Sequence, residues 1–196
     1  MGDDVPGGNG ASGWRPTSIR GADRRALAPI ADARGSFTEL WRASWTPAVP
    51  EGFLQANLSR SSAGVLRGLH FHERQTDLWL VVEGLASVAL VDVRPLVSGD
   101  SARPIVEHFD MEAGSATVIP PGVAHGFVAV RELSLLYLVS REYDGTDEFG
   151  FAWDDALAGV SWPVPEPILS QRDATNPPLT EAIELVRQRG VLREAR

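Results

Sequence analysis

Three of the four histidines lie in two stretches whose spacing suits chemistry. His70 and His72 are two residues apart in the stretch 64–84, GVLRGLHFHERQTDLWLVVEG, so on a β-strand their side chains project to the same face. His125 follows a Pro-Pro-Gly turn in the stretch 114–127, GSATVIPPGVAHGF, and that turn can return it to the same space. Imidazoles gathered in one space serve as general bases or as ligands of a metal ion. The histidines alone leave both alternatives open.

The composition limits the class of ligand. The net charge of −8 argues against nucleic acid as a partner, because binding a phosphate backbone needs clustered cations. All 18 basic residues are arginine, which suits forked recognition of a small phosphorylated ligand, although a GC-rich genome is the plain alternative. No cysteine is present, so disulfides and thiol catalysis are excluded.

The N-terminal sequence predicts neither a signal nor an anchor. Residues 1–13 are rich in glycine and aspartate, so we expect them to be disordered and residues 14–196 to form a single domain. No apolar segment of a secretory signal is visible, and no apolar run approaches the length of a membrane span. We therefore expect a cytoplasmic protein without a membrane partner.

The elements that must position the histidines are short β-strands. Apolar runs separated by turn signals, typical of a β-sandwich or barrel, cover residues 78–82, 86–93, 106–109, 116–119, 126–130 and 133–139. Two earlier segments, 36–41 and 53–60, also have strand character. The second has a polar face of Gln55, Asn57 and Ser59, which is either exposed or lines a pocket. Residues 180–189 predict a short C-terminal helix, with Thr180 as a possible N-cap and Gly190 as the stop signal.

The two histidine stretches resemble the signatures of the cupin superfamily. The first matches at Gly64, His70, His72, Asp77 and Gly84, with Asp77 where the signature has Glu. The second matches at Gly114, Pro120, Gly122 and His125, although its final Asn is Ala129. The resemblance implies a mostly β fold, the double-stranded β-helix or jelly roll. It also implies an alternative function, a metal-dependent oxygenase or isomerase in which a divalent transition metal binds to His70, His72, Asp77 and His125.

Further motifs are similar to one cupin family in particular. They are LRGLHF at 66–71, AHGF at 124–127, VSWP at 160–163 and LSQRD at 169–173. They resemble the dTDP-4-dehydrorhamnose 3,5-epimerase family, whose members invert carbons next to the 4-keto group of a dTDP-linked deoxyhexose. This resemblance implies a homodimer that needs no metal or other cofactor and binds a dTDP-sugar.

The same resemblance implies a role for individual residues. His70 would be the base, oriented by Asp173, and Tyr137 would be the acid on the opposite face of the sugar. Tyr143 is expected to be a packing residue. The substrate contacts would come from seven residues: Arg34, Glu39, Gln55, Asn57, Arg67, His125 and Glu148.

One position departs from the family pattern. The family has Lys in a Gln-x-Lys-Leu sequence, where its ammonium stabilises the enolate, whereas this chain has Gln75-Thr76-Asp77-Leu78 and no lysine at all. A carboxylate there opposes developing negative charge. Either another group stabilises the enolate oxygen, or a metal ion does so. A third possibility is a non-catalytic module that binds a sugar nucleotide.

Overall fold

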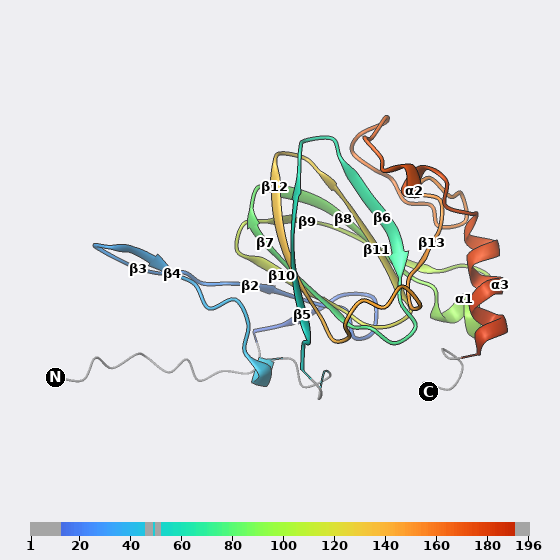
Figure 1. The fold of residues 1–196 in the computed structure, drawn as a ribbon, viewed down its shortest axis with the longest axis horizontal. Helices are drawn as coiled ribbons and strands as arrows, with labels where there is room; N and C mark the ends of the chain where they lie inside the picture. Colours follow the sequence, from blue (N-terminus) through green and yellow to red (C-terminus); the bar gives the residue numbers. More distant parts are fainter. Residues whose placement is uncertain (1–12, 46–48, 50–51, 191–196) are drawn as a thin grey trace.

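Two antiparallel β-sheets form a barrel in the computed structural model, which describes residues 13–45, 49 and 52–190 (Figure 1). In sheet order, the six-stranded sheet consists of β1 (Arg15–Pro16), β2 (Asp23–Ala26), β10 (Ser115–Ile119), β7 (Asp77–Glu83), β12 (Leu133–Val139) and β5 (Gln55–Ser61). The five-stranded sheet consists of β13 (Phe149–Gly150), β6 (Leu66–Phe71), β11 (Val123–Ala129), β8 (Leu85–Asp92) and β9 (Ile105–Glu112). The prediction of a mostly β jelly roll is confirmed.

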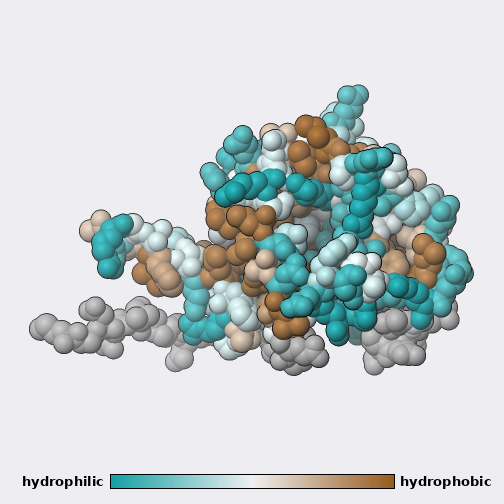
Figure 2. Space-filling model, viewed as in Figure 1, coloured by the Kyte–Doolittle hydropathy of each residue, from teal (hydrophilic) through white to brown (hydrophobic). Residues whose placement is uncertain are grey.

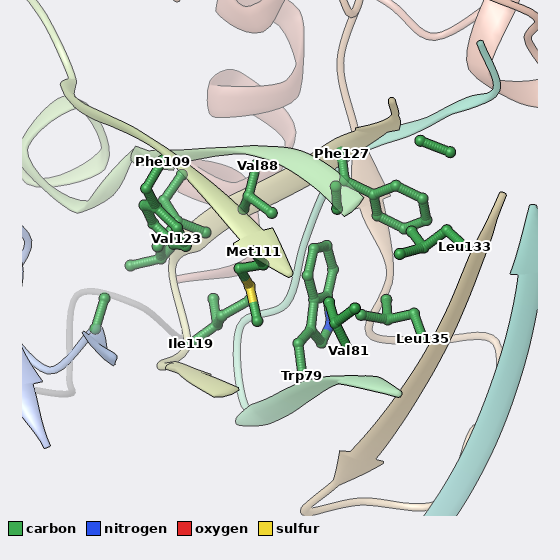
Figure 3. Packing of buried hydrophobic residues seen from close by; sticks show 14 of the residues in the cluster. Trp79, Val81, Val88, Phe109, Met111, Ile119, Val123, Phe127, Leu133 and Leu135 are labelled. Atoms are coloured by element: carbon green, nitrogen blue, oxygen red, sulfur yellow. The ribbon is translucent and has the colours of Figure 1, made fainter. Parts of the chain in front are cut away.

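The apolar core lies between the two sheets. Figure 3 shows Trp79 and Leu135 of the six-stranded sheet meeting Val88 and Phe127 of the five-stranded sheet. The indole of Trp79 meets the ring of Phe127 edge to face, with centroids 5.6 Å apart. Part of this core also lines the cavity described below, through Trp79, Phe127 and Leu135.

A second apolar cluster covers the outer face of the five-stranded sheet. The helices α1 (Arg94–Ser98) and α3 (Leu179–Arg189) pack there with the segment around Phe151 (Figure 1). Helix α3 confirms the predicted C-terminal helix, but Thr180 is not its cap. The helix begins after Pro178, and the Asp155 carboxylate accepts the hydrogen bond of the Leu179 backbone N–H instead. The helix ends at Gly190, as expected, in a left-handed conformation.

The N-terminal part of the described chain contains a separate hairpin. Strands β3 (Ile30–Asp32) and β4 (Gly35–Phe37) pair with each other and project from the barrel, followed by the 3-10 turn η1 (Ala43–Trp45) (Figure 1). The strand predicted over 36–41 therefore ends at Phe37. Among the described residues, no strand pairs with the chain beyond Phe37, so the chain leaves the hairpin there. The disorder expected for residues 1–13 falls on residues outside the described chain, except for Gly13, and the single-domain organisation stays a prediction.

Strands β6 and β11 approach each other unusually closely where they carry His70 and His125. These two histidines are cross-strand partners, and the register shifts between His125 and Phe127. A Cβ at Gly68, whose φ is +130°, would lie 2.6 Å from the Cα of Gly126. Only glycine leaves room for this contact. Within the described residues, no helix is long and apolar enough to cross a bilayer.

Candidate active site

A cavity of about 520 Å³ opens between the sheets, a volume within the usual range for small-molecule sites. Strand alternation explains its lining, because every second residue points inward. Strand β5 contributes Gln55, Asn57 and Ser59, so the polar face predicted for this strand lines a pocket. Strand β12 contributes Tyr137 on the same side. The remaining polar lining residues are Arg67, His70, His72, Gln75, Asp77, His125, Tyr143, Glu148, Ser170, Arg172 and Asp173.

A histidine–carboxylate pair occupies one wall. His70 on β6 donates from Nε2 to Asp173 Oδ1 at 2.6 Å, across 103 residues of sequence. The short helix α2 (Gln171–Ala174) carries Asp173, and its N-cap Ser170 donates to Asp173 Oδ2 at 2.9 Å. Burial raises the pKa of Asp173, but the hydrogen bond and charge of His70, together with Ser170, outweigh it and lower the pKa overall. An ionised carboxylate only accepts, so Nδ1 of His70 keeps its lone pair and can act as a base.

Both tyrosines line the cavity, in different environments. Tyr137 lies between Asn57 of β5 and Trp79 of β7 in the sheet register. Burial raises the pKa of Tyr137, and the negative charges of Asp77 and Glu148 raise it further, so the phenol keeps its proton. Tyr143 is 67% exposed, so the expectation that it packs in the core is wrong. It follows the end of β12, where the chain has left the barrel, and its backbone N–H donates to Gln55 at 2.9 Å.

Charged groups stand at the opening of the cavity. Arg67 donates from Nε to Ser61 Oγ at 3.0 Å, which fixes its guanidinium against the β5 wall. Arg172 forms a 2.7 Å ion pair with Glu148. Arg172 was not among the predicted site residues, and the signal that could have found it is its position directly before Asp173 in LSQRD.

Two predicted substrate contacts lie away from the cavity. Arg34 is at the tip of the β3–β4 hairpin, where it pairs with Asp32 at 2.5 Å and its side chain is 90% exposed. Glu39 follows the hairpin and pairs with Arg42 at 2.6 Å. Within one chain the structure does not bring these residues to the other predicted contacts, which are Gln55, Asn57, Arg67, His125 and Glu148.

A second cluster of histidine and carboxylate lies in the same cavity. One ligand atom from each of His72, Asp77 and His125 lies within 4.8 Å of the others. His125 Nε2 is 3.5 Å from Asp77 Oδ2, and burial lowers the pKa of His125 to about 4. Two nitrogen donors and one carboxylate oxygen fit a divalent transition metal. His70, the fourth residue of the alternative metal set, is not part of this cluster, and its Nε2 bonds to Asp173 instead.

Comparison with known proteins identifies the family. The family model described as dTDP-4-dehydrorhamnose 3,5-epimerase matches residues 16–181. The chain belongs to this family. The epimerase family consists of isomerases, so its match favours the epimerase interpretation over a metal-dependent oxygenase.

Individual relatives match this chain over most of its length, and two of them are solved structures of similar fold. The spore coat polysaccharide biosynthesis protein SpsL of Bacillus subtilis is 35% identical over 148 residues, which cover 74% of this chain and 96% of SpsL. NovW, a 4-keto-6-deoxy sugar epimerase of Streptomyces spheroides, is 29% identical with a TM-score of 0.77, covering 89% of this chain and 90% of NovW. A dTDP-6-deoxy-D-glucose-3,5-epimerase of Legionella pneumophila, solved with dTDP-4-keto-L-rhamnose, is 28% identical with a TM-score of 0.76, covering 85% and 92%.

Proposed function

We propose that this chain is an epimerase that inverts C3, C5 or both in a dTDP-linked 4-keto-6-deoxyhexose. The observation that carries the proposal is the 2.6 Å pair of His70 and Asp173, which shares one cavity with the protonated phenol of Tyr137. Relatives of similar fold act on or bind sugars of this class, as NovW and the Legionella complex illustrate.

Epimerisation next to a ketone moves protons and no net electrons. The C–H bond beside the ketone breaks, its proton goes to His70 Nδ1, its electron pair forms the C=C bond, and the carbonyl π pair moves to the oxygen. Tyr137 then donates its proton to the carbon from the opposite face, where the C=C pair forms the new C–H bond, the oxygen pair re-forms the carbonyl and the phenol becomes a phenolate. Asp173 stabilises the imidazolium that forms on His70. Because the steps are redox-neutral, we propose that the proton transfers need no organic or redox cofactor.

Arginines and amides provide the chemistry for the rest of the substrate. Arg67 and Arg172 are the guanidinium groups in the cavity lining, and a diphosphate is the anion that forked guanidinium donors suit. Gln55 donates to Asn57 Oδ1 at 2.9 Å, which leaves the Asn57 amide N–H groups for a sugar hydroxyl or a carbonyl. Glu148 holds Arg172 and would set its position toward the nucleotide.

Arg34 can contribute if the protein is a homodimer, which we propose. The hairpin has an exposed apolar cross-strand pair, Ile30 and Phe37, and the edge strand β5 exposes Leu58. Figure 2 shows apolar side chains on the hairpin and on the side of the barrel next to it. A second copy would cover both surfaces and bring Arg34 to the neighbouring cavity, and Glu39 with it.

The dimer proposal has a separate test. Light scattering should give twice the chain mass, and Arg34→Ala should raise KM for the dTDP-sugar roughly tenfold, the loss of one charged hydrogen bond, with kcat almost unchanged. A fully active monomer would contradict it. A dTDP-sugar enzyme would work in the cytoplasm, where nucleotide sugars are made, and would need neither nucleic acid nor a membrane.

The reaction is tested by incubating the protein with dTDP-4-keto-6-deoxyglucose in deuterium oxide and following C3 and C5 by NMR. We expect deuterium at one or both carbons, and the labelled position identifies the carbon that is inverted. His70→Asn should greatly slow the exchange. Tight dTDP binding without any exchange would instead support the non-catalytic binding module, which the carboxylate at Asp77 favours.

A further inference from the structure

We propose that His72, Asp77 and His125 bind one divalent transition-metal ion inside the substrate cavity. The binding site is argued from the geometry alone. Its consequence for catalysis, a positive charge facing the enolate oxygen, rests on the proposed function.

Backbone carbonyls select the tautomer of both imidazoles. The Val123 carbonyl lies 3.1 Å from His125 Nδ1, and the Asp147 carbonyl contacts His72 Nδ1. A carbonyl only accepts, so Nδ1 carries the hydrogen in each ring, and Nε2 of each neutral imidazole has a free lone pair. This is the usual arrangement of metal-binding histidines, in which a hydrogen bond on one nitrogen orients the other nitrogen toward the ion.

The third member of the cluster is held in the same way. Gln75 donates to Asp77 Oδ1 at 2.7 Å, which leaves Oδ2 facing His125 Nε2 at 3.5 Å. This separation is too long for a hydrogen bond, and both atoms are acceptors in the tautomer that Val123 imposes. The Asp77 side chain is only 5% exposed, and within the described residues no arginine lies within 4 Å of its carboxylate. Asp77 Oδ2 and the two Nε2 atoms therefore form a buried group of acceptors that a bound cation would stabilise.

The loop that orients His72 is itself anchored. The carboxylate of Asp147 accepts hydrogen bonds from the backbone N–H groups of Glu73 at 2.8 Å and Arg74 at 3.1 Å. The carbonyl of the same residue therefore has a fixed position behind His72. Outer contacts of this kind decide how tightly a first ligand shell binds its metal.

The donor set selects the class of ion. Two imidazole nitrogens and one carboxylate oxygen suit Zn, Fe, Mn, Co or Ni rather than Mg or Ca, which prefer oxygen ligands alone. Three protein ligands leave positions open toward the cavity. His70 is not a member of the cluster, whose ligand atoms lie within 4.8 Å of one another, so the base and the cation do not compete for one histidine. The ion would supply the positive charge that a chain without lysine lacks at this position.

Metal binding to the full-length protein tests the proposal. After EDTA treatment and dialysis, we expect Co²⁺ to give a visible d–d spectrum that saturates at one ion per chain, and Zn²⁺ to bind with the same stoichiometry by calorimetry. His72→Asn, the least buried ligand change, should weaken binding by at least roughly tenfold. His108→Gln, which removes the exposed fourth histidine, and His70→Asn should bind like the wild type. Circular dichroism shows whether each variant is folded.

The outcomes separate this proposal from the epimerase proposal. Absence of stoichiometric binding, or equal binding by folded His72→Asn and His108→Gln, would overturn the metal site even if the stripped enzyme still exchanges deuterium. Stoichiometric binding without any exchange would support the metal site and contradict the epimerase. Exchange that falls after EDTA treatment and returns with Zn²⁺ or Co²⁺ would support both.

Discussion

The cavity contains two histidine–carboxylate sites that are built from the same residue types and differ in which ring nitrogen is held. In the first, the Asp173 carboxylate accepts the hydrogen bond of His70 Nε2 at 2.6 Å, so donor and acceptor match and Nδ1 is left as a base. In the second, the Val123 carbonyl accepts the hydrogen bond of His125 Nδ1, so Nε2 is an acceptor that lies 3.5 Å from another acceptor, Asp77 Oδ2. The hydrogen-bond acceptor on one ring nitrogen sets the tautomer, and the tautomer decides whether the imidazole is suited to act as a general base or as a ligand of a cation.

The largest expected effect comes from His70. His70→Asn should lower deuterium exchange by about 10²–10⁴-fold, because it removes the general base while the asparagine stays polar. Cobalt binding should not change. Enzyme assays and the cobalt titration on one preparation check both halves. A variant that loses both properties together would show that the two sites are not separate.

Variants of the two tyrosines test which of them donates the proton opposite His70. Tyr137→Phe should slow formation of the inverted product by about 10²-fold, because the opposite-face proton donor is lost, whereas abstraction by His70 remains. Tyr143→Phe is the matched control, since it removes a hydroxyl from the exposed tyrosine, and it should turn over almost like the wild type. The reverse result would assign the acid role to Tyr143. Product formation and substrate wash-in are measured in parallel.

The cluster of His72, Asp77 and His125 predicts how the stability of the metal-free protein depends on pH. Burial lowers the pKa of His125 to about 4, against about 6.5 in the unfolded chain. The unfolded chain therefore takes up a proton first, so the free energy of unfolding is highest above pH ~6.5 and falls as the pH decreases to about 4. The gap between the two pKa values corresponds to about 3 kcal/mol.

Urea denaturation in EDTA between pH 7 and pH 4 measures this loss. His125→Gln should show a much flatter profile than the wild type, and His108→Gln should keep most of the decline. Equal profiles for wild type and His125→Gln would show that the folded protein does not exclude the proton from this imidazole.

The smallest expected effect concerns the residue behind the base. Ser170→Ala removes one hydrogen bond to Asp173 and the side-chain cap of α2, so we expect a loss of about 1 kcal/mol in stability and a several-fold decrease in kcat. Since Ser170 helps to lower the pKa of Asp173, the acid limb of the kcat profile should move to higher pH. If the acid limb of the kcat profile does not move, Ser170 acts only as the N-cap of α2. Ser170→Thr, which keeps the hydroxyl, should restore the profile.

The features that follow from strand alternation and from family motifs could be predicted from the sequence. Strand alternation predicted that Gln55 and Asn57 share one polar face, and the family resemblance predicted that this face contacts the substrate. The family motifs also paired His70 with Asp173 across 103 residues. It did not find Arg172, whose partner Glu148 is chosen by tertiary folding. It placed Arg34 among the contacts although the chain holds it outside the cavity lining, because a motif identifies a residue but not its position in the folded chain. It also could not assign the imidazole tautomers, which depend on carbonyls of distant loops.

The contact between Gly68 and Gly126 has a consequence for anyone who wishes to change the substrate range. Gly68 lies two residues before His70 and Gly126 directly follows His125, and a side chain at either glycine would force the strands apart. A mutational library at these two positions would therefore disturb the base and the cation site in one step. To change one of the two sites at a time, both glycines should be kept, and substitutions should be made in the cavity residues of β5 and around Glu148 at the cavity opening.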